Sequence, residues 1–236
     1  MKRRAFLLAV AAASVAPALA QGRPMKIGVI GSGRIGSTIG ALWAKAGHEV
    51  MFSDRDAEQV KRAIDALEPE LKARARAGSV AEAAAFGDAI LIAVPYAALP
   101  AVQQQVGAQL KGKVVVDPNN PVPSRDGELG AKAREKGAGV STAALLPGAR
   151  VVRAFNSWGY GVMAREANRP APRMAIPVAA DDAAALKLGM QLVADAGFDP
   201  VAAGSLAASK AFDLGSSVSG RVLTATEMRQ ALQLKP

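Results

Sequence analysis

The sequence has no cysteine and only one histidine, and both shortages narrow the chemistry open to it. Disulfides, thiolate metal sites, iron–sulfur clusters and cysteine nucleophiles all require the missing residue. The one histidine, His48, lies in "AGHEV" at an expected helix-to-strand turn, where a structural role is usual. We therefore expect no catalytic histidine–carboxylate pair of the kind that reduces a simple carbonyl group. We predict no catalytic acid or base and no metal site.

Aromatic residues are also few, at 4% of the chain, whereas alanine, glycine and valine are common. Such a composition suits closely packed helices and strands better than an aromatic-rich β-sandwich. The 236 residues are enough for one sizeable domain with a small appendage.

Acidic residues are fewer than basic ones, and the formal net charge is +9. The basic residues are interleaved with acidic ones, as in "RDAEQVKRAIDALEPELKARARAG", which is typical of a solvated helix face. We therefore expect no nucleic-acid partner. A net positive field would instead suit a polyanionic cofactor.

Residues 1–20 have the three parts of an export signal, namely a cationic start, a mildly apolar middle and an A-x-A site at Ala18–Ala20. Arg3 and Arg4 resemble the pair in twin-arginine signals, whose route exports proteins that are already folded. The apolar run is too short and weak to span a membrane, so we expect no stable membrane anchor. The signal predicts a periplasmic or otherwise exported protein; if translation begins at Met25, the protein is cytoplasmic instead.

Short apolar runs alternate with longer amphipathic runs in the rest of the chain. They predict strands at 26–31, 48–54, 88–95, 113–120 and 150–155, and helices at 32–47, 56–77 and 97–110. This alternation predicts an α/β fold with a Rossmann-type doubly wound parallel sheet.

The rhythm changes after about residue 160. The pattern there predicts a strand within 168–181, a helix at 181–197, a strand at 198–204 and a mainly helical tail from Ser205. We therefore expect an NAD(P)-binding Rossmann domain at 25–160. A small C-terminal α+β appendage at 161–236 would complete a second-substrate pocket.

Gly31, Gly33 and Gly36 form a G-x-G-x-x-G motif directly after the first expected strand. In dinucleotide-binding folds these glycines permit a tight turn, a close approach of backbone to pyrophosphate, and close helix–strand packing. The amides near Arg34 and Ile35 would then point at phosphate from the helix N-terminus. In this context the motif predicts a dinucleotide cofactor.

The second expected strand ends in "FSDRD", which contains signals for both nicotinamide cofactors. An acidic residue such as Asp54 normally binds the ribose hydroxyls of NAD, whereas an arginine such as Arg55 normally binds the 2′-phosphate of NADP. Ser53 could donate a hydrogen bond to that phosphate, and Lys61 or Arg62 could help to neutralise it. This pattern favours NADP and leaves NAD open.

Six segments carry a family resemblance: "KIGVIGSGRIGSTIGALWAKAGHEV", "SDRD", "LIAVPYAAL", "VVVDPNNP", "RVVRAFN" and "PVAADDAAALKLGMQLVADAGFDPV". In this order they resemble the deazaflavin (coenzyme F420)-dependent NADP reductases, over residues 25 to about 205. The nucleotide domain of the six-transmembrane metalloreductases, which handles NADPH and a flavin, is also similar.

The resemblance implies where the cofactor and the acceptor bind. It places the pyrophosphate at Ser32, Arg34 and Ile35, and the adenosine phosphate at Ser53 and Arg55. Asp54 stands where the family usually has arginine. The nicotinamide would lie beside Val94, Pro95 and Tyr96, and the ring and acceptor pocket would be bordered by Asn120, Pro121, Phe155 and Asn156.

The function implied is an NAD(P)H-dependent oxidoreductase that passes hydride to or from a flavin or deazaflavin. Such a transfer between rings needs no protein acid or base, which agrees with the shortage of histidine. Two alternatives remain: a reductase of small imines or carbonyls, and a non-catalytic NAD(P)-binding protein. The expected partners are a small-molecule cofactor and acceptor, and a homodimer stays open.

Overall fold

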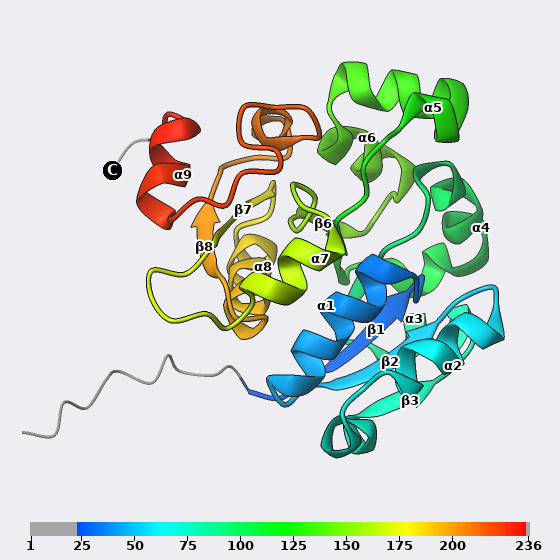
Figure 1. Ribbon diagram of the computed structural model, residues 1–236. Helices are drawn as coiled ribbons and strands as arrows, with labels where there is room; N and C mark the ends of the chain where they lie inside the picture. The colour runs from blue at the N-terminus through cyan, green and yellow to red at the C-terminus, as the bar shows by residue number, and fades with distance from the viewer. Residues whose placement is uncertain (1–22, 235–236) are drawn as a thin grey trace, which may run out of the picture.

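The computed structural model describes residues 23–234, so the expected export signal at residues 1–20 lies outside the described residues. Residues 23–234 form a β-sheet with helices packed on both faces (Figure 1). None of the helices in this range is long and apolar enough to cross a membrane.

The sheet has eight strands in the order β3-β2-β1-β4-β5-β6-β7-β8. Their bounds are β1 Lys26–Ile30, β2 Glu49–Ser53, β3 Ala75–Ala77, β4 Ala89–Ile92, β5 Val114–Asp117, β6 Arg150–Arg153, β7 Ala175–Ala180 and β8 Asp199–Ala202. Neighbouring strands are parallel except for β6 and β7. The chain winds from β1 to β3 in one direction and from β4 onwards in the other, which confirms the predicted Rossmann-type α/β fold.

Two groups of helices cover the two faces of this sheet. One face packs against α1 (Arg34–Lys45), α2 (Ala57–Asp65) and α8 (Ala183–Asp195). The other packs against α3 (Val80–Phe86), α4 (Leu99–Leu110), α5 (Pro123–Lys136) and α6 (Ala138–Leu145).

The strands are apolar throughout because both of their faces are covered. In β4, for example, Ala89 and Leu91 belong to the core under α1, whereas Ile90 and Ile92 belong to the core under α4. All four side chains are fully buried. Alternate residues of one strand thus anchor the two helical layers.

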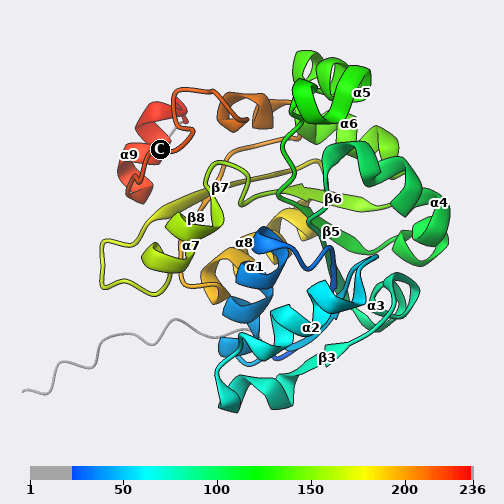
Figure 2. The ribbon, with the colours of Figure 1, turned by 45° about the vertical axis from the view of Figure 1, so that its right-hand side comes forward.

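The C-terminal region contributes β7 and β8 to the same sheet, at the end opposite β3 (Figure 2). The short helix α7 (Tyr160–Glu166) packs beside α1, and α9 (Ala225–Ala231) packs against β7 and β8. Three short 3-10 turns complete the elements within residues 23–234: η1 Pro69–Arg74, η2 Tyr96–Ala98 and η3 Ala208–Phe212.

Two expectations about local structure are wrong. The helix expected at 56–77 ends at Asp65, and η1 and β3 follow it, because Pro69 cannot continue a helix beyond its first turn. The tail from Ser205 is mostly turns and loops up to residue 234 rather than mainly helical. Gly215 and Gly220 interrupt it with φ angles of 89° and 78°, which a helix does not allow.

Candidate functional site

Two glycines of the motif between β1 and α1 are required by the fold itself. Gly31 has a φ of +96°, and a Cβ there would overlap the carbonyl oxygen of Ala93. A Cβ on Gly36 would overlap the carbonyl oxygen of Gly31, inside the same turn. Only glycine fits at these two positions.

Gly33 is different, because neither backbone nor packing requires glycine there. Its φ of −65° is ordinary. No protein atom lies within 4 Å of a Cβ built on it. The open space leaves the backbone accessible to a ligand, and a pyrophosphate requires such a close approach.

The start of α1 offers an anion site beside this opening. The helix begins directly after Gly33, with no side-chain cap and no acidic residue in its first turn. The first N–H groups of a helix have no partner within it, and the helix dipole favours negative charge there. The guanidinium of Arg34 lies over the ring of Tyr160, 5.2 Å from its centroid, so α7 holds a cation near the helix start.

A cleft of about 350 Å³ lies beside this helix start. Here the chain leaves β1 towards one face of the sheet and β4 towards the other, the place where open α/β sheets bind ligands. The cleft is lined by Gly33, Arg34, Ile35, Ala93, Val94, Pro95, Pro118, Asn119, Asn120, Arg125 and Trp158. The fold thus brings Val94, Pro95 and Asn120 together with the glycine loop, as the resemblance implies.

The lining of this cleft contains no His, Asp, Glu, Lys or Tyr. It therefore offers no side chain that exchanges a proton near neutral pH. Within residues 23–234 there is also no cluster of His, Asp and Glu that could hold a metal ion.

Asp54, directly after β2, contacts the glycine loop on the side away from the cleft. Its Oδ2 accepts a hydrogen bond of 2.8 Å from the amide of Ser32, and its Oδ1 accepts one of 3.2 Å from the amide of Asp56. Ser32 is fully buried. Gln59 on α2 donates to the carbonyl oxygen of Ser32 at 2.9 Å. The carboxylate of Asp54 is therefore built into the loop.

Ser53 does not have the role expected for it. Its hydroxyl is fully buried and donates to the carbonyl oxygen of Val29 at 2.8 Å. The one proton of this hydroxyl is thus used inside the sheet, so it is not available to an adenosine phosphate.

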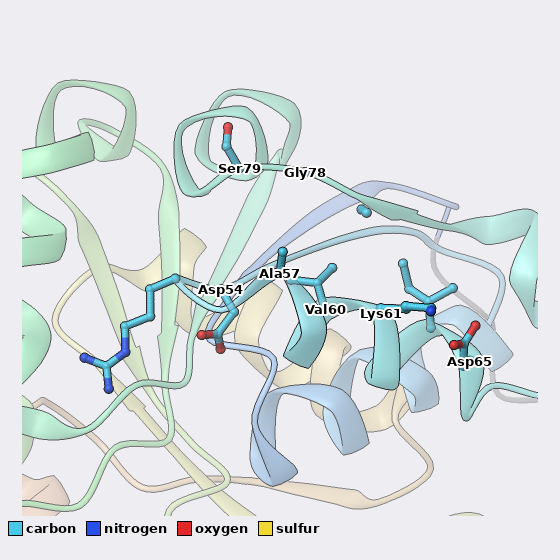
Figure 3. Close-up of a pocket in the computed structure, with 10 residues that line it drawn as sticks. Asp54, Ala57, Val60, Lys61, Asp65, Gly78 and Ser79 are labelled. Carbon is cyan, nitrogen blue, oxygen red and sulfur yellow. The ribbon is translucent and has the colours of Figure 1, made fainter.

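Arg55 is exposed and, with Asp54, lines a second pocket of about 510 Å³ between α2 and the end of β3 (Figure 3). Lys61 and Asp65 line the same pocket further along α2. This second pocket lies on the β2 side of the glycine loop.

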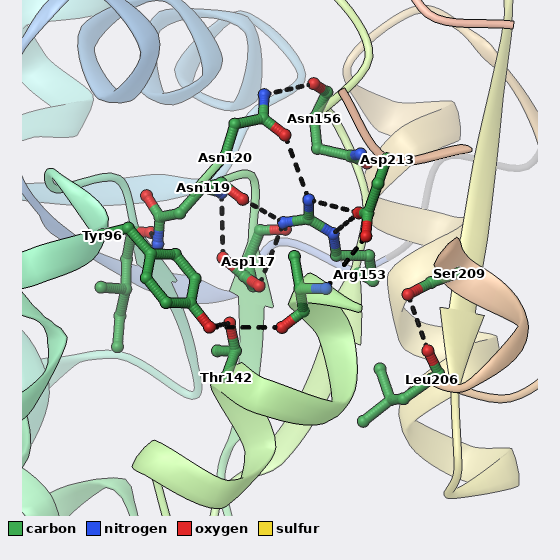
Figure 4. A network of polar contacts seen from close by, with 12 residues as sticks. Tyr96, Asp117, Asn119, Asn120, Thr142, Arg153, Asn156, Leu206, Ser209 and Asp213 are labelled. Atoms are coloured by element: carbon green, nitrogen blue, oxygen red, sulfur yellow. Dashed lines mark hydrogen bonds and ion pairs between the residues drawn. The ribbon is translucent and has the colours of Figure 1, made fainter. Parts of the chain in front are cut away.

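Behind the cleft lies a buried ion-pair network that the sequence pattern does not predict (Figure 4). The guanidinium of Arg153, at the end of β6, is fully buried and lies 3.1 Å from the carboxylate of Asp117 and 2.8 Å from that of Asp213. It also donates to the carbonyl oxygen of Asn119 and, at 3.2 Å, to Oδ1 of Asn120. Arg153 thus ties the asparagines of the cleft to the sheet and to the tail. The one signal for it in the sequence is a charged residue inside the apolar run "RVVRAF".

Two titratable groups of this region have shifted pKa values. Burial raises the pKa of Asp117, against the opposing effect of the Arg153 charge. Burial also raises the pKa of Tyr96 to about 12, so its phenol stays protonated at neutral pH. Neither residue lines the cleft, although the resemblance implies that Tyr96 lies beside the nicotinamide.

Phe155 and Asn156 are also placed differently from the expectation. Phe155 packs edge-on against Trp43 in the core, with ring centroids 6.0 Å apart. Asn156 is 2% exposed and donates to the carbonyl oxygen of Phe212 at 2.9 Å. Its own carbonyl oxygen accepts a hydrogen bond of 2.6 Å from Asn120. Asn156 therefore does not line the cleft; it fixes the side chain of Asn120 through this hydrogen bond.

Trp158 and Arg125 line the cleft and were not predicted. The indole N–H of Trp158 donates to the carbonyl oxygen of Arg221 at 2.9 Å. Arg125 donates to the carbonyl oxygen of Asn120 at 2.8 Å and pairs with Asp126. Both follow strands at the carboxyl edge of the sheet, and this position was the available signal for them.

His48 has the structural position expected for it. Its Nδ1 accepts a hydrogen bond of 3.2 Å from the amide of Met25, and its Nε2 lies 3.1 Å from the carboxylate of Asp195. The ring is buried and does not line the cleft. It joins the start of β1 to the end of α8.

Residues 26–121 match the family model of NADP oxidoreductases that depend on coenzyme F420. The matched range runs from β1 to the loop after β5, so it contains the glycine motif, Asp54 and Asn120. A search of curated protein sequences finds no match to this chain.

Several solved structures have the same fold. A hypothetical protein from Sinorhizobium meliloti aligns with a TM-score of 0.70 and 24% identity, over 85% of this chain and 95% of that one. A candidate F420-dependent NADP reductase from Arthrobacter sp. FB24 aligns with a TM-score of 0.61 and 24% identity, over 79% and 87%. The 3-hydroxyisobutyrate dehydrogenase of Mycobacterium tuberculosis aligns with a TM-score of 0.58 and 18% identity, over 80% and 57%. The chain thus has a Rossmann-type fold, and over residues 26–121 it is similar to F420-dependent NADP oxidoreductases.

Proposed function

We propose that the protein transfers a hydride between a nicotinamide cofactor and a flavin or deazaflavin acceptor. The observation that carries this proposal is Gly33, a glycine that the fold does not need, placed on the cleft at an uncapped helix start. These features fit a pyrophosphate, because backbone and anion can then come into direct contact. The family match over residues 26–121 supports the same class of cofactor.

The lining of the cleft supports a ring acceptor. Reduction of a carbonyl group needs a proton as well as a hydride, whereas transfer between two ring cofactors needs mainly close stacking and exclusion of water. Pro95, Pro118 and Trp158 provide rigid apolar and aromatic surface, and the lining has no proton donor that works near neutral pH. In this scheme Gly33 and the start of α1 bind the phosphates, and the apolar lining orients the rings.

The test is a titration of the purified protein with NADH and NADPH, followed by addition of FMN, FAD or a deazaflavin. We expect acceptor-dependent loss of the reduced-nicotinamide absorbance. Gly33→Val is the matched control, because it should weaken both cofactor binding and turnover while it stays folded. Binding without transfer to any ring acceptor would instead indicate a non-catalytic nucleotide-binding protein. Turnover with cyclic imines or small carbonyl compounds alone would indicate the second alternative.

We also propose that the protein is exported in the folded state. The support is the three-part signal in residues 1–20 with its paired arginines. Cell fractionation should find the wild-type protein outside the cytoplasm and an Arg3→Lys/Arg4→Lys variant inside it. If both proteins stay in the cytoplasm with Met25 as the first residue, the proposal is wrong.

A further inference from the structure

The carboxylate of Asp54 is held in place by the loop that receives the pyrophosphate. β2 ends beside β1, where Ser53 is paired with Ile30. The carbonyl oxygen of Ser53 accepts a 2.9 Å hydrogen bond from the amide of Gly31. This pairing brings the Asp54 side chain against the amide of Ser32 at 2.8 Å. The second oxygen of Asp54 accepts from the amide of Asp56 at 3.2 Å.

Asp54 cannot easily turn away from this position. Ser32 is fully buried, so a rotation of Asp54 would leave its amide without a partner and without access to water. Gln59 holds the same residue from the α2 side, at the carbonyl oxygen. A ligand that requires Asp54 to move therefore has to disrupt the glycine loop itself.

The carboxylate keeps free acceptor capacity in this position. An ionised carboxylate has about four acceptor sites, and the two amides occupy one on each oxygen. One site on each oxygen is left for the two neighbouring hydroxyls of a ribose. Asp54 is also partly exposed, at the edge of the pocket on the β2 side of the loop (Figure 3).

The groups that could bind a 2′-phosphate are either already paired within the protein or exposed to solvent. The hydroxyl of Ser53 is used inside the sheet. Arg62 pairs with Asp56 at 3.2 Å and donates to Gln59 at 3.0 Å. Arg55 and Lys61 are exposed, and water and salt screen the attraction of exposed cations for a phosphate.

We propose that Asp54 makes this protein selective for NAD(H) over NADP(H), in contrast to the cofactor named for the family that residues 26–121 match. Asp54 would accept hydrogen bonds from the free 2′- and 3′-hydroxyls of the adenosine ribose, and it would repel a 2′-phosphate. The inference rests on the proposed function only for the presence of a dinucleotide in the cleft.

Calorimetric titration with ADP-ribose and with 2′-phospho-ADP-ribose tests the proposal without any hydride chemistry. The wild-type protein should bind ADP-ribose about tenfold more tightly or better, as expected for hydrogen bonds to a charged group. Asp54→Asn keeps the shape of the side chain and one acceptor oxygen but removes the charge. It should therefore weaken the binding of ADP-ribose and reduce the ratio of its affinity to that of 2′-phospho-ADP-ribose about tenfold. Asp54→Ser should strengthen the binding of 2′-phospho-ADP-ribose. Glu70→Gln, an equal charge change on an exposed side chain that lines neither pocket, should leave the ratio unchanged.

The outcomes separate this proposal from the proposed function. Tighter binding of the 2′-phosphorylated ligand to the wild-type protein would overturn the selectivity but leave the dinucleotide site intact. An unchanged affinity ratio in folded Asp54→Asn would remove Asp54 as its cause. If neither ligand binds, both proposals fail together. Urea unfolding of each variant shows whether a loss of binding reflects a loss of folding.

Discussion

Gly33 and Gly36 lie only three positions apart in the motif, but substitution should affect the stability of the protein much less at Gly33 than at Gly36. A Cβ on Gly33 meets no protein atom, and its φ of −65° is open to any residue. For Gly33→Ala we expect the free energy of unfolding to change by less than about 1 kcal/mol, because the loss of a favourable N-cap residue offsets the reduced entropy of the unfolded chain. A Cβ on Gly36 overlaps the carbonyl oxygen of Gly31 and lies 3.2 Å from Val29. Gly36→Ala should therefore lower the free energy of unfolding by about 1–3 kcal/mol or more, as in other overpacked cores.

Cofactor binding, unlike stability, should be sensitive to substitution at Gly33. A side chain there occupies the space through which the pyrophosphate approaches the backbone. A steric cost of about 1–3 kcal/mol corresponds to a dissociation constant about 5 to 150 times higher. Gly33→Val should raise the dissociation constant more than Gly33→Ala does, because two more methyl groups enter the same space. Calorimetry with NADH measures the binding, and urea unfolding measures the stability of the same preparations.

Two results would contradict these expectations. Normal NADH binding by Gly33→Val would show that no phosphate approaches this backbone. A destabilisation of Gly33→Ala equal to that of Gly36→Ala would show that the space at Gly33 is not open in solution.

Variants of the ion-pair network behind the cleft, of Trp158 on the cleft and of the last helix test the structure further. Arg153→Met leaves the buried carboxylate of Asp117 and the partly exposed carboxylate of Asp213 without their cation, and it should lower the free energy of unfolding by about 3–5 kcal/mol, as measured in urea; a loss near zero would mean that the network contributes little to stability. Trp158→Phe removes the hydrogen bond to Arg221 that holds the ring on the cleft, so it should raise the KM for the ring acceptor; an unchanged KM would show that this ring does not orient the acceptor. Hydrogen bonds from Thr224 lower the pKa of Glu227, so the contribution of this capping box to stability is present at neutral pH and is lost as the pH falls through the lowered pKa. The hydrogen-exchange protection factors in α9, which already allow for the intrinsic pH dependence of exchange, should therefore fall in acid in the wild type but not in Glu227→Gln, and equal acid dependence in both would contradict this assignment.

The five strands predicted before residue 160 are all present, because each is a mainly apolar run between turn signals. β3 was missed because it has only three residues, and two of them are exposed at the edge of the sheet. The helix pair α5 and α6 was also unassigned, since its sequence "PSRDGELGAKAREKGAGVSTAAL" is interrupted by glycines that local propensity disfavours in helices. In these segments tertiary packing decides the structure and the local pattern does not.

The sequence by itself determined the fold class and the class of cofactor. Alternating strands and helices define the doubly wound sheet, and a G-x-G-x-x-G motif between a strand and a helix is readable because both features are local in the chain. Only the tertiary structure decided which glycine faces open space, where the Asp54 carboxylate points, and that Ser53 and Asn156 turn inwards. The reason is that these properties depend on partners far away in the chain: Asp54 meets Ser32 across 22 positions, and Arg153 meets Asp213 across 60. No local pattern specifies such contacts, because they exist only once the strands have paired.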